Sequence, residues 1–188
     1  PRMWSEPLEM DDVVRAAISE VDEYQRIDVL ALEPALLKGK VVTDLAHLMS
    51  ELLDNATSFS PPDSFVRVGG RMSDEGYMIR ILDSGVGIST DRLKQLNELL
   101  REPPVVGLSV ESTLGMSVVS LLANKHGITV TLAAGNPGLI VDVLLPPTLF
   151  GPIDAEQPRA SVGTLDQVVG ASGGAAPEAP ATAPLIDL

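Results

Sequence analysis

The sequence predicts an α/β fold (α+β in the stricter sense), a two-layer sandwich in which helices cover one face of a mixed β-sheet. Two observations carry this prediction. The spacing of apolar residues changes repeatedly along residues 1–151 between helical intervals and the alternation typical of a strand. The resulting order is helix, strand, helix, two strands, helix, helix and two strands, without an internal repeat. Such an order suits helices packed on a sheet.

Each expected element has its own signal. Asp11 and Asp12 suit a helix start and precede apolar residues at helical spacing. Residues 26–32 alternate as a strand does, and Pro61-Pro62 stops the second helix. In chain order, the expected elements are a helix over Val13–Val21, a strand over Arg26–Leu32, a helix over about Val41–Phe59, strands over Phe65–Val68 and Tyr77–Leu82, helices over Thr90–Leu100 and about Gly115–His126, and strands over Ile128–Ala133 and Leu139–Leu145.

Composition excludes several kinds of site. The 188 residues contain no Cys and two His, which rules out a disulfide framework, a thiolate metal site and a His-rich metal cage. No apolar run reaches the roughly 18–20 residues that cross a bilayer, so we expect this sequence not to be membrane-embedded and to be cytoplasmic. The chain begins with Pro1, which indicates a piece of a longer protein, and a membrane anchor upstream stays open.

The charge balance excludes another class of partner. The formal net charge of -13 would repel a phosphate backbone, so we expect no nucleic-acid binding. A single nucleotide stays possible, because backbone N–H groups and a metal ion can hold phosphates without net positive charge.

Residues 152–188 differ in composition from the rest of the chain. Ala, Gly and Pro make up 17 of these 37 residues, and five acidic residues face one Arg. So little apolar surface cannot offset the entropy of ordering, and we expect a disordered, acidic tail. Residues 1–151 then form the folded domain.

Three segments could carry chemistry. Glu51 and Asn55 lie four residues apart on the second helix, so they share a face, where a carboxylate and a carboxamide can hold a hydrated Mg²⁺. The alternative is a polar helix face in solvent.

The second segment is Asp83-Ser84-Gly85-Val86-Gly87, directly after an expected strand. Its glycines permit a sharp turn and the close approach of a flat ligand, and Asp83 could accept a hydrogen bond from an exocyclic amine such as that of adenine. An ordinary glycine-rich turn is the alternative.

The third segment, residues 113–119, leads from a loop into a helix at Gly115 and Met116. Free N–H groups at a helix N-terminus favour an anion, although a plain helix start explains the segment equally well.

Together, the three segments resemble in order and spacing the nitrogen box and the two glycine boxes of the histidine-kinase-type (GHKL) ATPase superfamily. Within it, residues 4–147 are most similar to the sensor-like histidine kinases of actinobacterial conservon operons. The stretches that carry the resemblance are Trp4–Pro7, Glu51–Pro62, Leu114–Val119 and Lys125–Ile128. The resemblance implies a Bergerat-type ATP-binding fold with ATP and Mg²⁺ as cofactors.

The resemblance also implies roles for the residues of the first two segments. Asn55 would coordinate the Mg²⁺ that bridges the phosphates, and Glu51, as the catalytic residue, would help hold the metal or position the attacking group. Asp83 would bind the adenine amine, and Gly85 and Gly87 would shape the pocket for the base.

Further roles fall on the second half of the chain. Gly115 and Met116 would flank the phosphates at a helix start, and the loop from about Leu96 to Thr113 would be the lid over them. Ser58 stands where many kinases place a basic residue, so one phosphate contact is expected to be missing.

Two departures affect the expected activity. Residues 111–115 read Glu-Ser-Thr-Leu-Gly where active kinases usually have Gly-x-Gly-Leu-Gly, which makes the second glycine box degenerate. The closing hairpin has Leu139 where the family often has Thr. Neither His47 nor His126 lies in a dimerisation hairpin, so we expect both to be structural or exposed rather than phosphate acceptors.

Three functions follow from the resemblance. The first is the ATP-binding catalytic domain of a sensor histidine kinase-like signalling protein, which transfers a phosphoryl group to a His outside this sequence. The alternative is a degenerate pseudokinase-type interaction module with weak or no nucleotide binding, whose partners would be a roadblock-type protein and a Ras-like GTPase. The third is simple ATP hydrolysis with Glu51 as general base.

Overall fold

The computed structural model describes residues 6–102 and 114–151, leaving aside the Leu114 side chain. The expectations for residues 111–113 of the second glycine box and for the tail over 152–188 lie outside the described residues, as does Trp4 of the resemblance. The elements, in chain order, are β1 (Leu8–Glu9), α1 (Met10–Ile18), the 3-10 helix η1 (Tyr24–Arg26), β2 (Ile27–Leu32), β3 (Leu36–Leu37), α2 (Gly39–Ser58), β4 (Val66–Ser73), β5 (Gly76–Leu82), α3 (Thr90–Arg101), α4 (Leu114–His126), β6 (Thr129–Ala134), β7 (Leu139–Leu145) and the 3-10 helix η3 (Pro147–Leu149).

The main sheet is mixed, as expected. Its five strands run in the order β2-β4-β5-β7-β6. The edge strand β2 pairs in parallel with β4, whereas β4 with β5, β5 with β7 and β7 with β6 are antiparallel. The parallel pair needs a crossover, and α2 provides it between β2 and β4.

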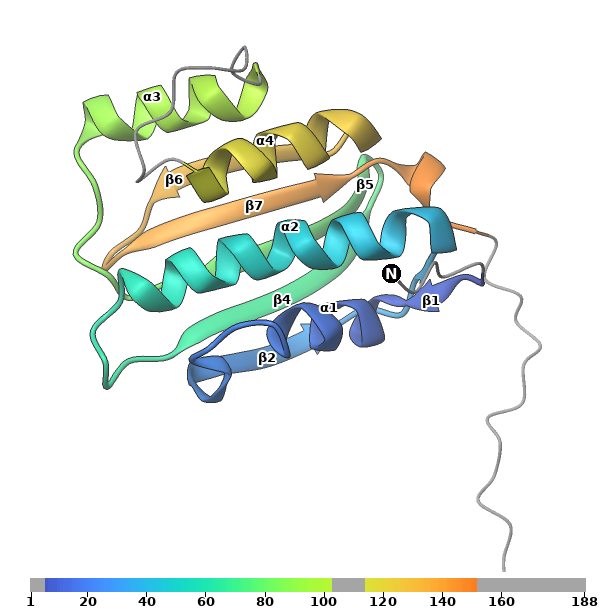
Figure 1. Cartoon of the computed structure of the whole chain (residues 1–188), viewed down its shortest axis with the longest axis horizontal. Coiled ribbons are helices and arrows are strands. Elements are labelled where there is room, and N and C mark those ends of the chain that lie inside the picture. The colour runs from blue at the N-terminus through green and yellow to red at the C-terminus, as the bar shows by residue number, and fades with distance from the viewer. Residues whose placement is uncertain (1–5, 103–113, 152–188) are drawn as a thin grey trace, which may run out of the picture. The chain divides into compact units, whose positions relative to one another are not determined.

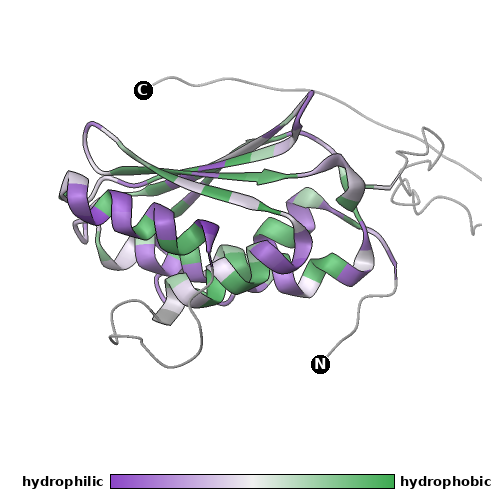
Figure 2. Cartoon of the chain, turned by 90° about the horizontal axis from the view of Figure 1, so that it is seen from above, coloured by the Kyte–Doolittle hydropathy of each residue, from purple (hydrophilic) through white to green (hydrophobic). Residues whose placement is uncertain are grey.

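The helices lie on one face of this sheet, and the two-layer fold class is therefore confirmed (Figures 1 and 2). The long helix α2 lies between α1 and α4, and α3 lies beyond α4 against β6. Apolar residues at helical spacing bury one side of α2, among them Leu45, Leu48, Met49 and Leu52. They meet the inward side chains of the sheet, such as Ile79 and Val143, in one core.

The structure adds one feature and corrects another. Leu8–Glu9 pairs with Leu36–Leu37 in a small separate sheet that the sequence did not predict, because strands of two residues have no periodicity to detect. Residues 96–101 belong to helix α3, so the expected lid cannot begin at Leu96, and its remaining part, residues 103–113, lies outside the described residues.

Candidate functional site

A cavity of about 280 Å³ opens at one end of the sandwich, between the C-terminal half of α2, the loop after β5 and the starts of α3 and α4. Most of its wall is apolar. Its volume lies just below the roughly 300 Å³ at which ligand pockets in proteins begin, and such pockets combine an apolar wall with a few polar groups, so the lining fits a small organic ligand. The predicted site residues that line the cavity are Asn55, Asp83, Gly85, Gly87 and Met116.

Helix α2 brings Glu51 and Asn55 to the same face, as their spacing predicted. The Asn55 side-chain Nδ2 donates to the Glu51 main-chain oxygen over 2.8 Å. Within the described residues nothing donates to the amide oxygen of Asn55, which is therefore available to a cation or to a water bound to one. One turn earlier, His47 Nε2 lies 3.3 Å from Glu51 Oε1.

The start of α4 packs against these two side chains. A Cβ added at Gly115 would lie 2.7 Å from Glu51 Oε2 and 3.4 Å from Asn55 Nδ2. The absence of a side chain at position 115 thus leaves room for the Glu51 carboxylate. Glu51 and Gly115 adjoin the cavity without being part of its lining, whereas Met116 reaches it.

Asp83 is the buried acid of the cavity, with 8% of its surface exposed. Its Oδ1 accepts from the main-chain N–H of Gly85 over 2.8 Å and of Leu139 over 3.1 Å. In the part of the chain that the structure describes, no protein group bonds to Oδ2. The two backbone donors fix the carboxylate and leave one oxygen for a ligand donor such as an exocyclic amine.

The two glycines after Asp83 serve different ends. A Cβ at Gly85 would come within 2.6 Å of the Phe59 carbonyl oxygen, so this glycine lets the loop lie against the end of α2. Gly87 has a φ of +71°, a left-handed conformation that favours glycine. Both glycines therefore shape the loop that forms one wall of the cavity.

The polar groups of Asp83, Asn55 and Glu51 fit an adenine nucleotide with its magnesium ion. Asp83 offers an acceptor in a cavity whose wall is mostly apolar, while Asn55 in the same lining and Glu51 beside it offer hard oxygen ligands. Within residues 6–102 and 114–151, no three His, Asp or Glu side chains gather closely enough to hold a metal ion. A magnesium ion here would keep several water molecules and share its remaining ligands with the phosphates, as Mg²⁺ commonly does.

Ten of the described residues that line the cavity were not among the predicted site residues, and these ten include one cation and two largely exposed apolar residues. Arg92, in the first turn of α3, is the one cation among the described lining residues, yet in the sequence it resembles an ordinary helix surface residue. Phe59, 68% exposed, and Val86, 97% exposed, lie at the cavity as well. Ser58 is exposed and does not line it, so no basic side chain comes from that position.

The two histidines differ in their surroundings. His126 is mostly buried and its Nε2 lies 2.6 Å from Asp44 Oδ2, at the other end of α2 from the cavity. His47 is 53% exposed beside Glu51. Each histidine was expected to be structural or exposed, and His126 is packed against Asp44 while His47 is exposed. That neither accepts a phosphoryl group stays a prediction.

Comparison with known proteins gives a consistent result. A family model described as "Histidine kinase-, DNA gyrase B-, and HSP90-like ATPase" matches residues 40–149. The signal transduction histidine-protein kinase/phosphatase MprB of Mycolicibacterium smegmatis is 30% identical over 152 residues, which are 75% of this chain and 30% of that protein. Sensor protein QseC of Salmonella typhi is 36% identical over 138 residues, 70% of this chain and 29% of that protein. The chain thus spans less than a third of the length of these relatives.

Solved structures have the same fold. The mycobacterial sensor histidine kinase MprB superposes with a TM-score of 0.59 at 26% identity, over 76% of this chain and 97% of that one. The ATP-binding domain of PrrB from Mycobacterium tuberculosis gives a TM-score of 0.56 at 23% identity, over 75% of this chain and 96% of that one. Among the described helices, none is both long and apolar enough to cross a membrane.

Proposed function

The chain belongs to the family of histidine kinase-, DNA gyrase B- and HSP90-like ATPases, and from this premise we propose that residues 1–151 form the ATP-binding catalytic domain of a sensor histidine kinase. It would bind Mg·ATP for phosphoryl transfer to a His outside this sequence. One observation carries the proposal: a single cavity brings the buried, half-satisfied carboxylate of Asp83 together with the amide of Asn55.

Different residues would bind the base and the phosphates of the nucleotide. Asp83 Oδ2 would accept from the adenine amine, while its fixed Oδ1 keeps the carboxylate in place. Gly85 and Gly87 would allow the flat base to approach the backbone. This end of the site determines which base is bound.

At the other end, Asn55 and Glu51 would hold the magnesium ion through oxygen atoms and water. Gly115 and Met116, at the start of α4, would flank the phosphates, where helix N–H groups favour an anion. The bound Mg·ATP supplies the phosphoryl group and the metal charge that offsets the phosphates. Arg92 supports an anionic ligand, because it is the one cation among the described lining residues, in a chain of net charge -13.

Calorimetric titration with ATP and ADP, with and without Mg²⁺, tests the proposal. Asp83→Asn keeps an acceptor for the two backbone donors but places an NH₂ group where the adenine amine would donate. Asp142→Asn is the matched control, since Asp142 pairs with Arg80 in the sheet and does not line the cavity. We expect micromolar binding that Asp83→Asn abolishes and Asp142→Asn preserves.

The opposite result would favour the second function. No heat at millimolar nucleotide would mean that the cavity does not hold ATP, and the domain would then be an interaction module. We place the protein near the conservon kinases, whose partners would be a roadblock-type protein and a Ras-like GTPase. Pull-down with those two classes of protein would test this finer assignment.

A third outcome concerns the reaction itself. Release of phosphate without a protein acceptor would indicate simple hydrolysis with Glu51 as general base.

A further inference from the structure

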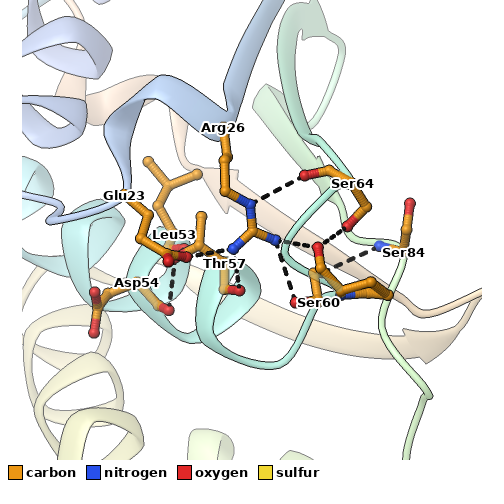
Figure 3. A network of polar contacts seen from close by, with 9 residues as sticks. Glu23, Arg26, Leu53, Asp54, Thr57, Ser60, Ser64 and Ser84 are labelled. Carbon is orange, nitrogen blue, oxygen red and sulfur yellow. Dashed lines mark hydrogen bonds and ion pairs between the residues drawn. The ribbon is translucent and has the colours of Figure 1, made fainter.

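Arg26 binds the backbone at the C-terminal end of helix α2 and in the turn that follows it. Its side chain is 15% exposed. Figure 3 shows Arg26, at the junction of η1 and β2, with the residues that it contacts. Its guanidinium donates to four main-chain carbonyl oxygens: Nη1 to Thr57 over 3.1 Å, Nη2 to Ser60 over 3.2 Å and to Pro61 over 2.6 Å, and Nε to Ser64 over 3.1 Å. The Thr57 carbonyl belongs to the last turn of α2, where carbonyls lack a partner within the helix, and the other three follow the helix. One guanidinium therefore binds both the end of α2 and the turn after it.

The segment that Arg26 holds is also a wall of the cavity. Phe59 belongs to this segment and lines the cavity, and its carbonyl oxygen would lie 2.6 Å from a Cβ at Gly85. The hydroxyl of Ser60 accepts from the main-chain N–H of Ser84 over 3.3 Å. Residues 57–64 therefore meet the loop that carries Asp83 through one hydrogen bond and one close backbone contact.

We propose that Arg26 is a positioning residue of the nucleotide site. It fixes the turn after α2, and through Phe59 and Ser60 that turn sets the place of the Asp83–Gly85 loop. Arg26 itself does not line the cavity, so its effect on a ligand is indirect. This inference rests on the proposed nucleotide binding for its functional readout, but the placement of the loop can be measured without a nucleotide.

The geometry requires an arginine rather than any cation. The planar guanidinium offers five donors in a fixed fork, whereas a lysine ammonium is a compact point charge on a flexible stem. Glu23 pairs with Nη1 as well, but its side chain is 52% exposed. The carbonyl bonds rather than this ion pair therefore hold the turn, and the charge alone does not.

The test compares Arg26→Lys with Arg80→Lys. Arg80 makes a two-bond pair with Asp142, 2.7 Å for each bond, away from the cavity, so both variants keep a positive charge and lose a fork of donors. We expect Arg26→Lys to weaken Mg·ATP binding about tenfold, the effect of misplacing one or two hydrogen bonds, and Arg80→Lys to change it less than about twofold. Thermal unfolding checks that each variant is folded at the temperature of the titration.

Two further readouts separate positioning from general stability. Arg26→Lys should shift the amide resonances of Ser84 and Gly85 in the nucleotide-free protein, and Arg80→Lys should not. Ser60→Ala should weaken binding in the same direction, and its effect should add only in part to that of Arg26→Lys, because the two substitutions share the Ser60–Ser84 contact. If Arg26→Lys fails to fold, Ser60→Ala and its effect on the Ser84 amide carry the test.

The outcomes are distinct. Unchanged Ser84 and Gly85 resonances in Arg26→Lys would overturn the inference. Equal losses of affinity in Arg26→Lys and Arg80→Lys would also overturn it, since they would reflect stability alone. If the unaltered protein binds no nucleotide, the proposed function fails, and the amide shifts still decide whether Arg26 positions the loop.

Discussion

At the scale of single residues, the backbone of Gly138 lies in close contact with Asp83, the buried acid of the cavity. A Cβ at Gly138 would lie 2.2 Å from the Asp83 carbonyl oxygen and 2.4 Å from its Oδ1. Backbone cannot yield to such an approach as the end of a flexible side chain can. The backbone of the hairpin between β6 and β7 thus packs directly against Asp83. In this position the main-chain N–H of Leu139 donates to Asp83 Oδ1.

Gly138→Ala should therefore damage both stability and binding. Gly138 has a φ of +80°, so the variant adds backbone strain to the collision, and we expect a loss of at least about 2 kcal/mol in the free energy of unfolding. Chemical denaturation measures this loss, and titration with Mg·ATP should show that binding has gone.

Gly127→Ala is the matched control for that change. Gly127 also has a positive φ, +66°, but a Cβ there would meet only Pro146 Cγ, at 4.0 Å. It should cost about 1 kcal/mol from strain alone and leave nucleotide affinity unchanged. Equal effects of the two substitutions would show that the contact with Asp83 has no special role.

At the scale of elements, Asp44 on α2 pairs with two residues of α4. Asp44 Oδ2 lies 2.7 Å from Lys125 Nζ and 2.6 Å from His126 Nε2, both in the last turn of α4. Burial alone would raise the pKa of Asp44, but the hydrogen bonds from Lys125 and His126 hold this pKa below its ordinary value. The start of α4 carries Gly115 and Met116, so this pairing at the far end helps to orient the helix that meets Glu51.

Asp44→Asn should lower the free energy of unfolding by about 1 kcal/mol at neutral pH, because the Lys125 side chain is 61% exposed and its share is small. A carboxyl whose pKa is lowered by folding stabilises the protein above its unfolded pKa, about 3.9, and that stability is lost as the pH falls through the lowered value. The difference between the two proteins should thus shrink below about pH 4.

Urea unfolding over an acid pH series measures this difference. Asp54→Asn is the control, since Asp54 is exposed on the same helix and forms no ion pair within the described residues. A gap between Asp44→Asn and the unaltered protein that stays constant with pH would contradict the assignment.

The elements also show what sequence reasoning can and cannot reach. The helices and strands of four or more residues were predicted in type, because their signal is a period that repeats along the chain. The acid Asp83 was predicted from its place after a strand. Its partner Leu139 and the packing of Gly138 were not, because they depend on a contact between residues 56 positions apart. Arg92 was missed for a related reason: on α3 only the three-dimensional fold distinguishes a cavity residue from a surface residue.

At the scale of the whole molecule, strand β3 pairs with the last residues of the described domain. Leu37 forms a bridge with Phe150, and the main-chain N–H of Gly151 donates to Leu36 over 2.9 Å. Tyr77 lies beside this pairing: its hydroxyl donates to the Glu33 carbonyl oxygen over 2.8 Å, and its ring centre is 5.7 Å from that of Phe150. One buried side chain therefore joins strand β5 to the connection after β2 and to the end of the described domain.

Tyr77 should also make the fold sensitive to alkali. Burial, and to a lesser extent the charge of Glu33, raises the pKa of Tyr77 from 10.0 to about 12. A group whose pKa is raised by folding contributes stability that is complete below its unfolded pKa and is lost as the pH rises to the folded one. We expect up to about 2 kcal/mol of unfolding free energy to disappear between pH 10 and about 12.

Tyr77→Phe isolates this contribution. The variant loses the hydrogen bond to Glu33, about 1 kcal/mol at neutral pH, but it has no hydroxyl to ionise, so its stability should fall less steeply between pH 10 and about 12. Tyr24→Phe is the control, because Tyr24, the other tyrosine of the chain, is 52% exposed. Unfolding at a series of alkaline pH values, followed by circular dichroism, gives the slopes. An equal slope in the unaltered protein and in Tyr77→Phe would mean that other groups cause the alkaline loss and that Tyr77 contributes packing alone.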